Sequence, residues 1–201
     1  MPRRRHLILL SAIAALALPA SANAGVLVAS APDCSAQSSS QVFMPWADPA
    51  SYVLAPGGTA ESAAGWTLSG GAAIVSGNEP AHVNDAGDGS SLSLPPGSSA
   101  TTDTMCIGIQ NPDIRFFARS CLGKGVVSVE TLFETSSGDV VSAPAGVITA
   151  AGWAPTAPLP IVASLLPLLP GNMTPVQFRF TSIGSAPVSI DDVYVDPYGS
   201  R

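Results

Sequence analysis

Positive charge and histidine are scarce in this sequence of 201 residues. It holds two histidines and eight lysines and arginines against fourteen acidic residues, for a formal net charge of −6. Nucleic-acid binding needs a positive surface, so this balance argues against a nucleic-acid partner. His82 is the one histidine outside the first six residues, and no cysteine or further histidine stands at a spacing typical of zinc ligands.

Catalytic motifs are missing as well. The sequence has no GxSxG nucleophile turn in a strand–helix context, no phosphate-binding P-loop and no dinucleotide-binding GxGxxG. A glycosidase needs two carboxyl groups that flank the scissile bond, whereas the adjacent Asp191 and Asp192 of a strand would point to opposite faces. We therefore expect no enzymatic activity.

Unbroken apolar runs are absent except near the start of the chain. Three arginines (3–5), the apolar run "LILLSAIAALAL" (7–18) and the small residues "ANA" (22–24) predict a secretory signal peptide over 1–24. Its apolar run is too short for a stable membrane span. We expect residues 25–201 to be a secreted, extracellular or cell-envelope protein with five basic and fourteen acidic residues and no membrane span.

Helical spacing of apolar residues is also absent, and short apolar runs broken by Gly, Pro, Asn and Asp recur throughout. In "VVSVETLFE" (126–134), Val127 and Val129 alternate with Ser128 and Glu130, which is typical of a half-buried strand. About ten such runs predict an all-β fold, a two-sheet antiparallel β-sandwich (jelly roll), as one domain over 41–198. We expect residues 25–40 to form a flexible N-terminal segment.

One apolar stretch, "APTAPLPIVASLLPLLPG" (154–171), contains five prolines. Proline interrupts helices and central strands, so this stretch allows at most one short helix near 161–166. Two interpretations remain open. The stretch is either a long connection that packs its leucines over an end of the sandwich, or an exposed patch that binds a protein partner.

Cysteine is rare, and the number of cysteines is odd. If Cys106 and Cys121 flanked a tight hairpin around 110–113, Cys121 would lie four residues beyond the partner of Cys106, or about 13 Å along the strand. A disulfide needs Cα atoms within about 7 Å of each other. We therefore predict a disulfide between Cys34 and Cys106 and a free Cys121.

Two segments point to a family. The segment "APGGTAESAAGWTLSGGAAIVSGNEPAHV" (55–83) and the segment "SIDDVYVDP" (189–197) resemble the opening and the last strand of a jelly-roll carbohydrate-binding module of the galactose-binding-like superfamily. The chain also resembles a group of small secreted bacterial proteins without assigned activity. Such modules often hold a structural calcium ion between their first and last strands. The resemblance therefore implies a calcium site at Glu61 and Asp191.

The alternation of a strand bears on this site. Asp191, Val193 and Val195 would share one face of the last strand, which would hold the Asp191 carboxylate at the edge of the core. A carboxylate there needs a cation or several hydrogen-bond donors. Asp192 would lie on the other face, solvated or bonded to a turn.

The resemblance also implies a sugar-binding surface. In such modules, exposed aromatic rings stack on sugar rings and a few polar groups set the orientation. The expected ligand contacts are Trp46, Tyr52, Trp153 and Tyr198, with His82 and Asn84 as polar groups. Each of these aromatic residues also fits a core position, and Trp66 is expected in the core. We predict a secreted, non-catalytic module that recognises carbohydrate; the alternative is an extracellular or envelope protein that binds a protein partner through 154–171.

Overall fold

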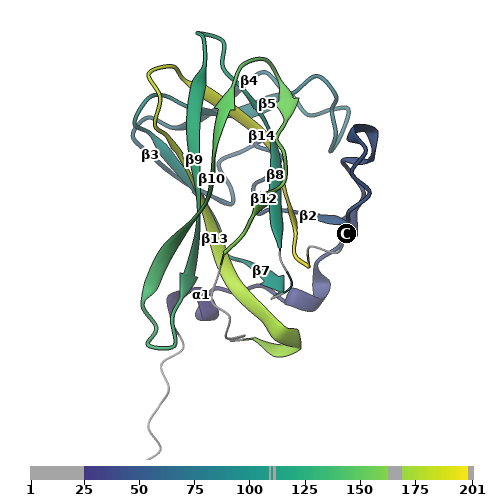
Figure 1. The fold of residues 1–201 in the computed structure, drawn as a ribbon, viewed down its shortest axis with the longest axis vertical. Helices are drawn as coiled ribbons and strands as arrows, with labels where there is room; N and C mark the ends of the chain where they lie inside the picture. The colour runs from purple at the N-terminus through teal and green to yellow at the C-terminus, as the bar shows by residue number, and fades with distance from the viewer. Residues whose placement is uncertain (1–24, 109, 111, 163–168, 199–201) are drawn as a thin grey trace, which may run out of the picture.

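The computed structural model describes residues 25–108, 110, 112–162 and 169–198. The predicted signal peptide lies outside these residues, and so does most of the helix expected near 161–166. The strands pair into two antiparallel sheets, as predicted (Figure 1). The larger sheet contains β1 (Ser39–Ser40), β2 (Tyr52–Leu54), β4 (Ala73–Ser76), β5 (Ser90–Leu94), β8 (Asp113–Arg119), β11 (Ala154–Pro155), β12 (Leu159–Pro160) and β14 (Val188–Asp196). The smaller sheet contains β3 (Trp66–Ser69), β6 (Ser99–Thr102), β7 (Met105–Gly108), β9 (Gly125–Glu134), β10 (Val140–Ala150) and β13 (Met173–Ser182).

The alternation seen in the sequence appears in the burial of β9. Val127 and Val129 are fully buried, whereas Ser128 and Glu130 face outward. Glu130 forms a surface ion pair with Arg179 of the neighbouring strand β13, with 2.8 Å between Nη2 and the carboxylate. One apolar and one polar face are what a strand at the surface of a sandwich requires.

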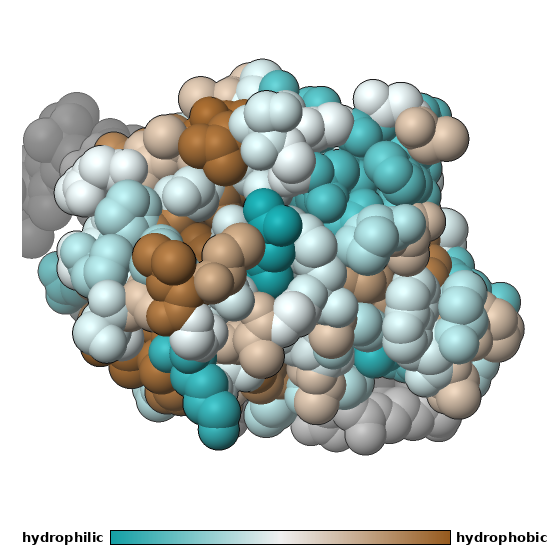
Figure 2. All heavy atoms as spheres, turned by 90° about the horizontal axis from the view of Figure 1, so that it is seen from above, coloured by the Kyte–Doolittle hydropathy of each residue, from teal (hydrophilic) through white to brown (hydrophobic). Residues whose placement is uncertain are grey.

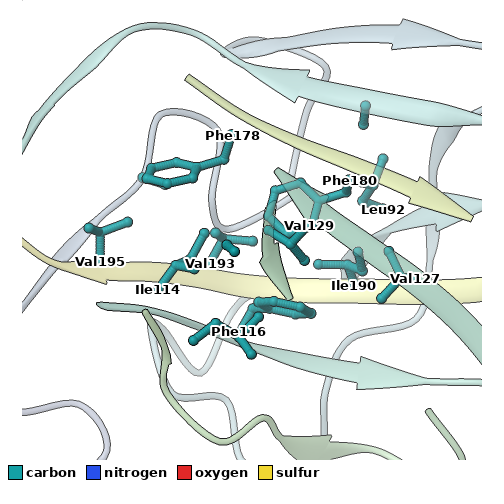
Figure 3. Close-up of a cluster of buried hydrophobic side chains, with 14 of the residues drawn as sticks. Leu92, Ile114, Phe116, Val127, Val129, Phe178, Phe180, Ile190, Val193 and Val195 are labelled. Atoms are coloured by element: carbon teal, nitrogen blue, oxygen red, sulfur yellow. The ribbon is translucent and has the colours of Figure 1, made fainter. Parts of the chain in front are cut away.

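The main core lies between the two sheets. Figure 3 shows Phe178, Phe180 and Val129 of the smaller sheet facing Phe116 and Ile190 of the larger one. Phe116 and Phe180 meet edge to face, with 5.2 Å between ring centroids. Trp66 packs on Phe180 at 5.8 Å and is buried, which confirms its predicted core position.

The last strand, β14, contains an irregularity that the sequence analysis missed. Asp191 pairs with Phe117 of β8, but Tyr194 pairs with Arg115, so β14 has one residue more than β8 over this interval. Asp192 adopts a left-handed conformation there (φ 48°). Such a β-bulge shifts the alternation of side chains by one residue.

The bulge overturns the predicted face of Asp191. Ile190, Val193 and Val195 all belong to the main core, whereas Asp191 pairs with Phe117, which lies on the outer face of the larger sheet. The prediction that Asp191 shares a face with Val193 and Val195 is therefore wrong, because the extra residue separates them.

The outer face of the larger sheet carries a second apolar cluster. It consists of four buried aromatic residues, Phe43, Tyr52, Phe117 and Tyr194, against which Trp46 and Trp153 pack. Phe43 stacks on Phe117 at 6.1 Å and meets Tyr52 edge to face at 5.0 Å. The segment that contains Phe43 and Trp46 therefore covers this side of the sheet.

The segment 25–40 differs from the flexible one expected. It contains α1 (Val26–Ala29), the 3-10 helix Cys34–Ala36 and β1. Leu27 is buried, and its backbone N–H donates to the Glu134 carboxylate at 2.5 Å. The predicted disulfide between Cys34 and Cys106 is confirmed, with Cα atoms 5.5 Å apart. Apolar burial and this covalent link explain why the segment packs against the sandwich.

Cys121 is free, as predicted, and it is exposed, but the assumed hairpin is wrong. Cys106 lies in β7, which pairs with β13, whereas β8 pairs with β14 in the other sheet. The correct pairing thus followed from incorrect local geometry, because residues 105–108 and 113–119 belong to different sheets.

The described half of the proline-rich stretch joins the sandwich. Its strands β11 and β12 pair with β8, and Leu159 and Ile161 are buried in the main core. Pro155 and Pro160 are tolerated because β11 and β12 lie at the edge of the sheet. The leucines at 165, 166 and 168 lie outside the described residues. No helix in the described part of the chain is long and apolar enough to cross a membrane.

Candidate functional site

A groove of about 540 Å³ opens beside the outer aromatic cluster. We call it the Trp46 groove; it is lined by Trp46, Ala47, Asp48, Pro49, Ala50, Arg115 and Pro158. The 3-10 helix Met44–Trp46 has Pro45 in its first turn, and the residue after it, Ala47, adopts a left-handed conformation (φ 58°). This sharp end turns the chain directly after the indole and places Asp48 next to it.

Asp48 is the centre of a hydrogen-bond network beside this groove. Its Oδ2 accepts from Arg115 Nη1 at 2.6 Å and from the Tyr52 hydroxyl at 2.7 Å, and its Oδ1 accepts from the Ala50 N–H at 3.1 Å. Burial alone would raise the pKa of Asp48, but these hydrogen bonds and the Arg115 charge outweigh it, so the pKa lies below its ordinary value. The carboxylate is therefore ionised and its position fixed.

Arg115 is equally well held. Its Nε donates to the Thr156 carbonyl at 2.6 Å, and its guanidinium lies 4.5 Å from the centre of the Phe43 ring. Trp46 meets Phe117 edge to face at 5.2 Å and is half-buried. The groove therefore presents a fixed aromatic ring next to a fixed polar pair.

The structure places three of the predicted ligand residues around the same aromatic cluster. Trp46 lines the groove. Tyr52 is 1% exposed and its hydroxyl donates to Asp48, so a ligand in the groove cannot reach Tyr52. Burial and the Asp48 carboxylate raise the pKa of Tyr52 well above its ordinary value, so its hydroxyl remains a donor. Trp153 packs on the cluster next to a second groove.

The other predicted residues lie elsewhere. His82 and Asn84 are exposed on the loop between β4 and β5, where Asn84 Oδ1 accepts from the Tyr194 hydroxyl at 3.3 Å. Tyr198 is 51% exposed and borders a separate apolar pocket with Pro32 and Met173. The six candidates therefore do not form one surface. Sequence reasoning missed Asp48 and Arg115. For Asp48 a signal was available, because Asp48-Pro49 is a typical turn sequence and follows Trp46 closely.

Buried acids gather where the bulge of β14 meets the β4–β5 loop. Asp191 accepts from the backbone N–H of Glu79 and of Asp192, both at 3.0 Å. The Glu79 carboxylate accepts from the N–H groups of Ala81 and Val83 at 2.6 and 2.7 Å. Glu79 and Asp191 are both fully buried, so backbone donors satisfy most of their acceptor capacity.

Asp192 is the exception in this group. It is 1% exposed, and within the described residues neither carboxylate oxygen accepts from an N–H or hydroxyl donor. The prediction that Asp192 is solvated or bonded to a turn is therefore wrong, because its side chain is buried next to Asp191 at the bulge. Burial is the main cause that raises the pKa of Asp192 to about 8, and the charges of Asp191, Glu79 and Asp88 and a hydrogen bond between the Asp192 and Glu79 carboxyl groups add to it.

The predicted calcium ligand Glu61 lies within electrostatic range of this group. Glu61 is exposed, and its Oε1 accepts from the N–H groups of Gly89 and Ser90 at 2.9 and 2.8 Å. Burial, together with the charges of Glu79 and Glu61, raises the pKa of Asp191 to about 7 against the effect of its hydrogen bonds. Among the described residues, no three or more acidic, histidine or cysteine side chains are arranged as a ready metal site.

Neither a protein-family model nor a curated protein matches the chain. Solved structures do match. One comprises the CBM22-1 and GH10 modules of a Clostridium thermocellum endo-1,4-beta-D-xylanase complexed with xylohexaose (TM-score 0.49, 9% identity, 73% of this chain and 28% of that one). Another is the CBM22-1 xylan-binding domain of Paenibacillus barcinonensis Xyn10C (TM-score 0.48, 10% identity, 71% and 93%). This chain is similar to carbohydrate-binding modules. A third such module is the C-terminal CBM6 of a Zobellia galactanivorans laminarinase (TM-score 0.43, 13% identity, 63% and 88%).

Proposed function

We propose that this chain is a secreted, non-catalytic carbohydrate-binding module whose saccharide lies in the Trp46 groove. The observation that carries the proposal is the half-buried Trp46 indole next to the Asp48–Arg115 pair. An indole face stacks on the apolar face of a sugar ring, and fixed carboxylate and guanidinium groups bond sugar hydroxyls. The network that holds both groups in place means that little conformational freedom is lost on binding.

The charges in the groove support binding rather than hydrolysis. A glycosidase uses two carboxyl groups, one of which is protonated and donates to the leaving group. Among the described residues that line the groove, Asp48 is the one carboxylate, and its lowered pKa keeps it ionised. A saccharide would therefore be held in the groove without acid catalysis.

Secretion is part of the proposal. The basic and apolar residues at the start of the sequence, followed by "ANA", support export. The disulfide between Cys34 and Cys106 also supports an oxidising compartment.

Retention by insoluble polysaccharides is the experiment that tests this function. We expect the mature protein to bind an insoluble polysaccharide such as xylan, and the Trp46→Ala variant to lose most of that binding. Tyr198→Ala is the matched control, because Tyr198 is an exposed aromatic residue outside the groove. Equal retention of the Trp46→Ala variant and the wild-type protein would contradict the proposed site.

We also propose that one structural calcium ion binds near Glu61, Asp191 and Asp192. Within the described residues, no N–H or hydroxyl group donates to either buried Asp192 oxygen. This supports the proposal, because an ionised buried carboxylate without donors is costly and Ca²⁺ takes carboxylate oxygens as ligands. Bound calcium would link the bulge of β14 to the loops on either side of it. A rise in the unfolding temperature with added calcium, absent in Asp192→Asn, is the expected result.

A further inference from the structure

A second groove lies where β8 and β10 end, and we call it the Arg119 groove. The Ser120 N–H donates to the Ala151 carbonyl at 2.7 Å and joins its two sides. Figure 2 looks down on this end of the molecule, where hydrophilic and apolar side chains are interspersed. The groove is open and shallow, with a lining of Arg119, Ser120, Cys121, Gly123, Lys124, Ala151, Gly152 and Trp153.

Two arginines lie on the outer face of β8 in similar settings. Arg115 lies over the Phe43 ring, and Arg119 lies over the Trp153 ring at 4.9 Å. Arg115 is neutralised by Asp48. Arg119 has no ion pair within the described residues, and its Nε is buried without a hydrogen-bond partner. A buried guanidinium N–H without an acceptor is unfavourable, so an acceptor from outside the chain would stabilise it.

Other donors in the same groove are also unsatisfied. Ser120 is 8% exposed, and its hydroxyl has no hydrogen-bond partner among the described residues. The Trp153 Nε1–H is buried, and no acceptor in the described part of the chain reaches it. Lys124 adds a second positive charge and is exposed. The groove therefore gathers donors and cations, which complement an anionic, oxygen-rich group.

The charge of the whole chain makes this arrangement unusual. Fourteen acidic residues are present, yet the described ion pairs use Arg115 and Arg179 and leave Arg119 and Lys124 without a carboxylate. The planar guanidinium fork fits a carboxylate with two parallel hydrogen bonds. An aromatic ring under the guanidinium holds its plane in a fixed orientation.

We infer that the Arg119 groove binds the carboxylate of an acidic sugar unit, so that the saccharide of this module is a uronate-containing one. The inference rests on the proposed function. Arg115 and Arg119 are four residues apart on one strand, or about 13 Å, so one oligosaccharide can reach both grooves. Between Arg115 and Arg119, β11 pairs with Phe117 and Ala118 of β8, so β11 lies along the sheet between the two grooves.

Titration calorimetry with tetragalacturonate and its fully methyl-esterified form tests the inference, because the two share one sugar backbone and differ only at the carboxyl groups, which are ionised in the first and neutral methyl esters in the second. We expect the acid form to bind about ten- to a hundredfold more tightly, and the preference to fall with added salt. The Arg119→Gln variant should bind both forms alike. Arg179→Gln is the matched control, since Arg179 lies on the other sheet, and it should keep the preference.

Cys121 provides an independent readout in the groove itself. It is exposed and free, so bound tetragalacturonate should slow its alkylation by iodoacetamide in the wild-type protein but not in Arg119→Gln. Unfolding temperatures of the variants check that each is folded.

The outcomes separate the inference from the proposed function. Equal binding of the acid and ester forms, or no binding of the acid form, overturns the inference even if Trp46→Ala abolishes binding of other saccharides. An acid preference that Arg119→Gln removes and Trp46→Ala leaves unchanged supports the inference but contradicts the Trp46 groove as the saccharide site.

Discussion

Replacing Asp192 by asparagine removes a buried titratable carboxyl group while it changes the size of the side chain very little. Asp192 is almost fully buried beside Asp191 and Glu79, and its folded-state pKa is about 8, compared with 3.8 for an unperturbed aspartate. The folded protein thus binds a proton at this carboxyl more tightly than the unfolded chain does. The free energy of unfolding therefore falls as pH rises between about 4 and 8.

The size of this effect follows from the linkage of proton binding to folding. One carboxyl contributes up to about 1.4 kcal/mol per pH unit within that interval. For a chain of this size, 1 kcal/mol shifts the unfolding temperature by about 2–4 °C. The metal-free protein should therefore lose about 3–6 °C per pH unit through Asp192. Asp191, with its pKa raised to about 7, adds to the slope in the same direction.

Scanning calorimetry in chelator from pH 5 to pH 8 measures this slope. The Asp192→Asn variant should show a smaller slope than the wild-type protein and a higher unfolding temperature at pH 8. With added calcium at pH 8, the wild-type protein should instead have the higher unfolding temperature of the two, because calcium binds the ionised carboxylates. At a hundredfold excess over the dissociation constant it contributes about 2.7 kcal/mol to the wild-type protein. Asp103→Asn, at an exposed acid, is the control. Equal slopes for the wild-type and Asp192→Asn proteins would refute the account of a buried, unsatisfied carboxylate.

Two further predictions concern stability. The Cys34→Ser variant opens a covalent loop of 72 residues and should lose about 4 kcal/mol in the free energy of unfolding measured by urea denaturation; a loss below about 1 kcal/mol would contradict this. Arg115→Met leaves the Asp48 carboxylate without its counter-charge and should cost about 3 kcal/mol, compared with at most about 1 kcal/mol for Glu130→Gln at the more exposed ion pair. Equal losses at the two pairs would show that burial does not set their strength.

The fold class was readable from the sequence because burial and alternation coincide in the long strands. In β9, Val127 and Val129 alternate with Ser128 and Glu130 in the sequence and in the structure. Side-chain period and turn residues are local properties, so the sequence expresses them directly. The same logic failed in β14, because one inserted residue at Asp192 shifts every side chain before it to the other face.

The candidate site was readable only in part. Trp46 was predicted from its chemistry as an aromatic platform, but its partners depend on contacts between distant segments. Asp48 pairs with Arg115, which lies 67 positions away in the sequence, and no local sequence pattern predicts this pairing. The role of Tyr52 was equally unreadable, because a tyrosine at the end of a predicted strand can either contact a ligand or donate a hydrogen bond to a neighbouring carboxylate.

The binding of a saccharide at the Trp46 groove is measured most directly by affinity electrophoresis through gels that contain soluble xylan, polygalacturonate or no polysaccharide. We predict that at least one polysaccharide retards the mature wild-type protein, that Trp46→Ala migrates as in the empty gel, and that Tyr198→Ala is retarded like the wild-type protein. Retardation of Trp46→Ala equal to that of the wild-type protein, or no retardation of the wild-type protein in either polysaccharide gel, would contradict the account.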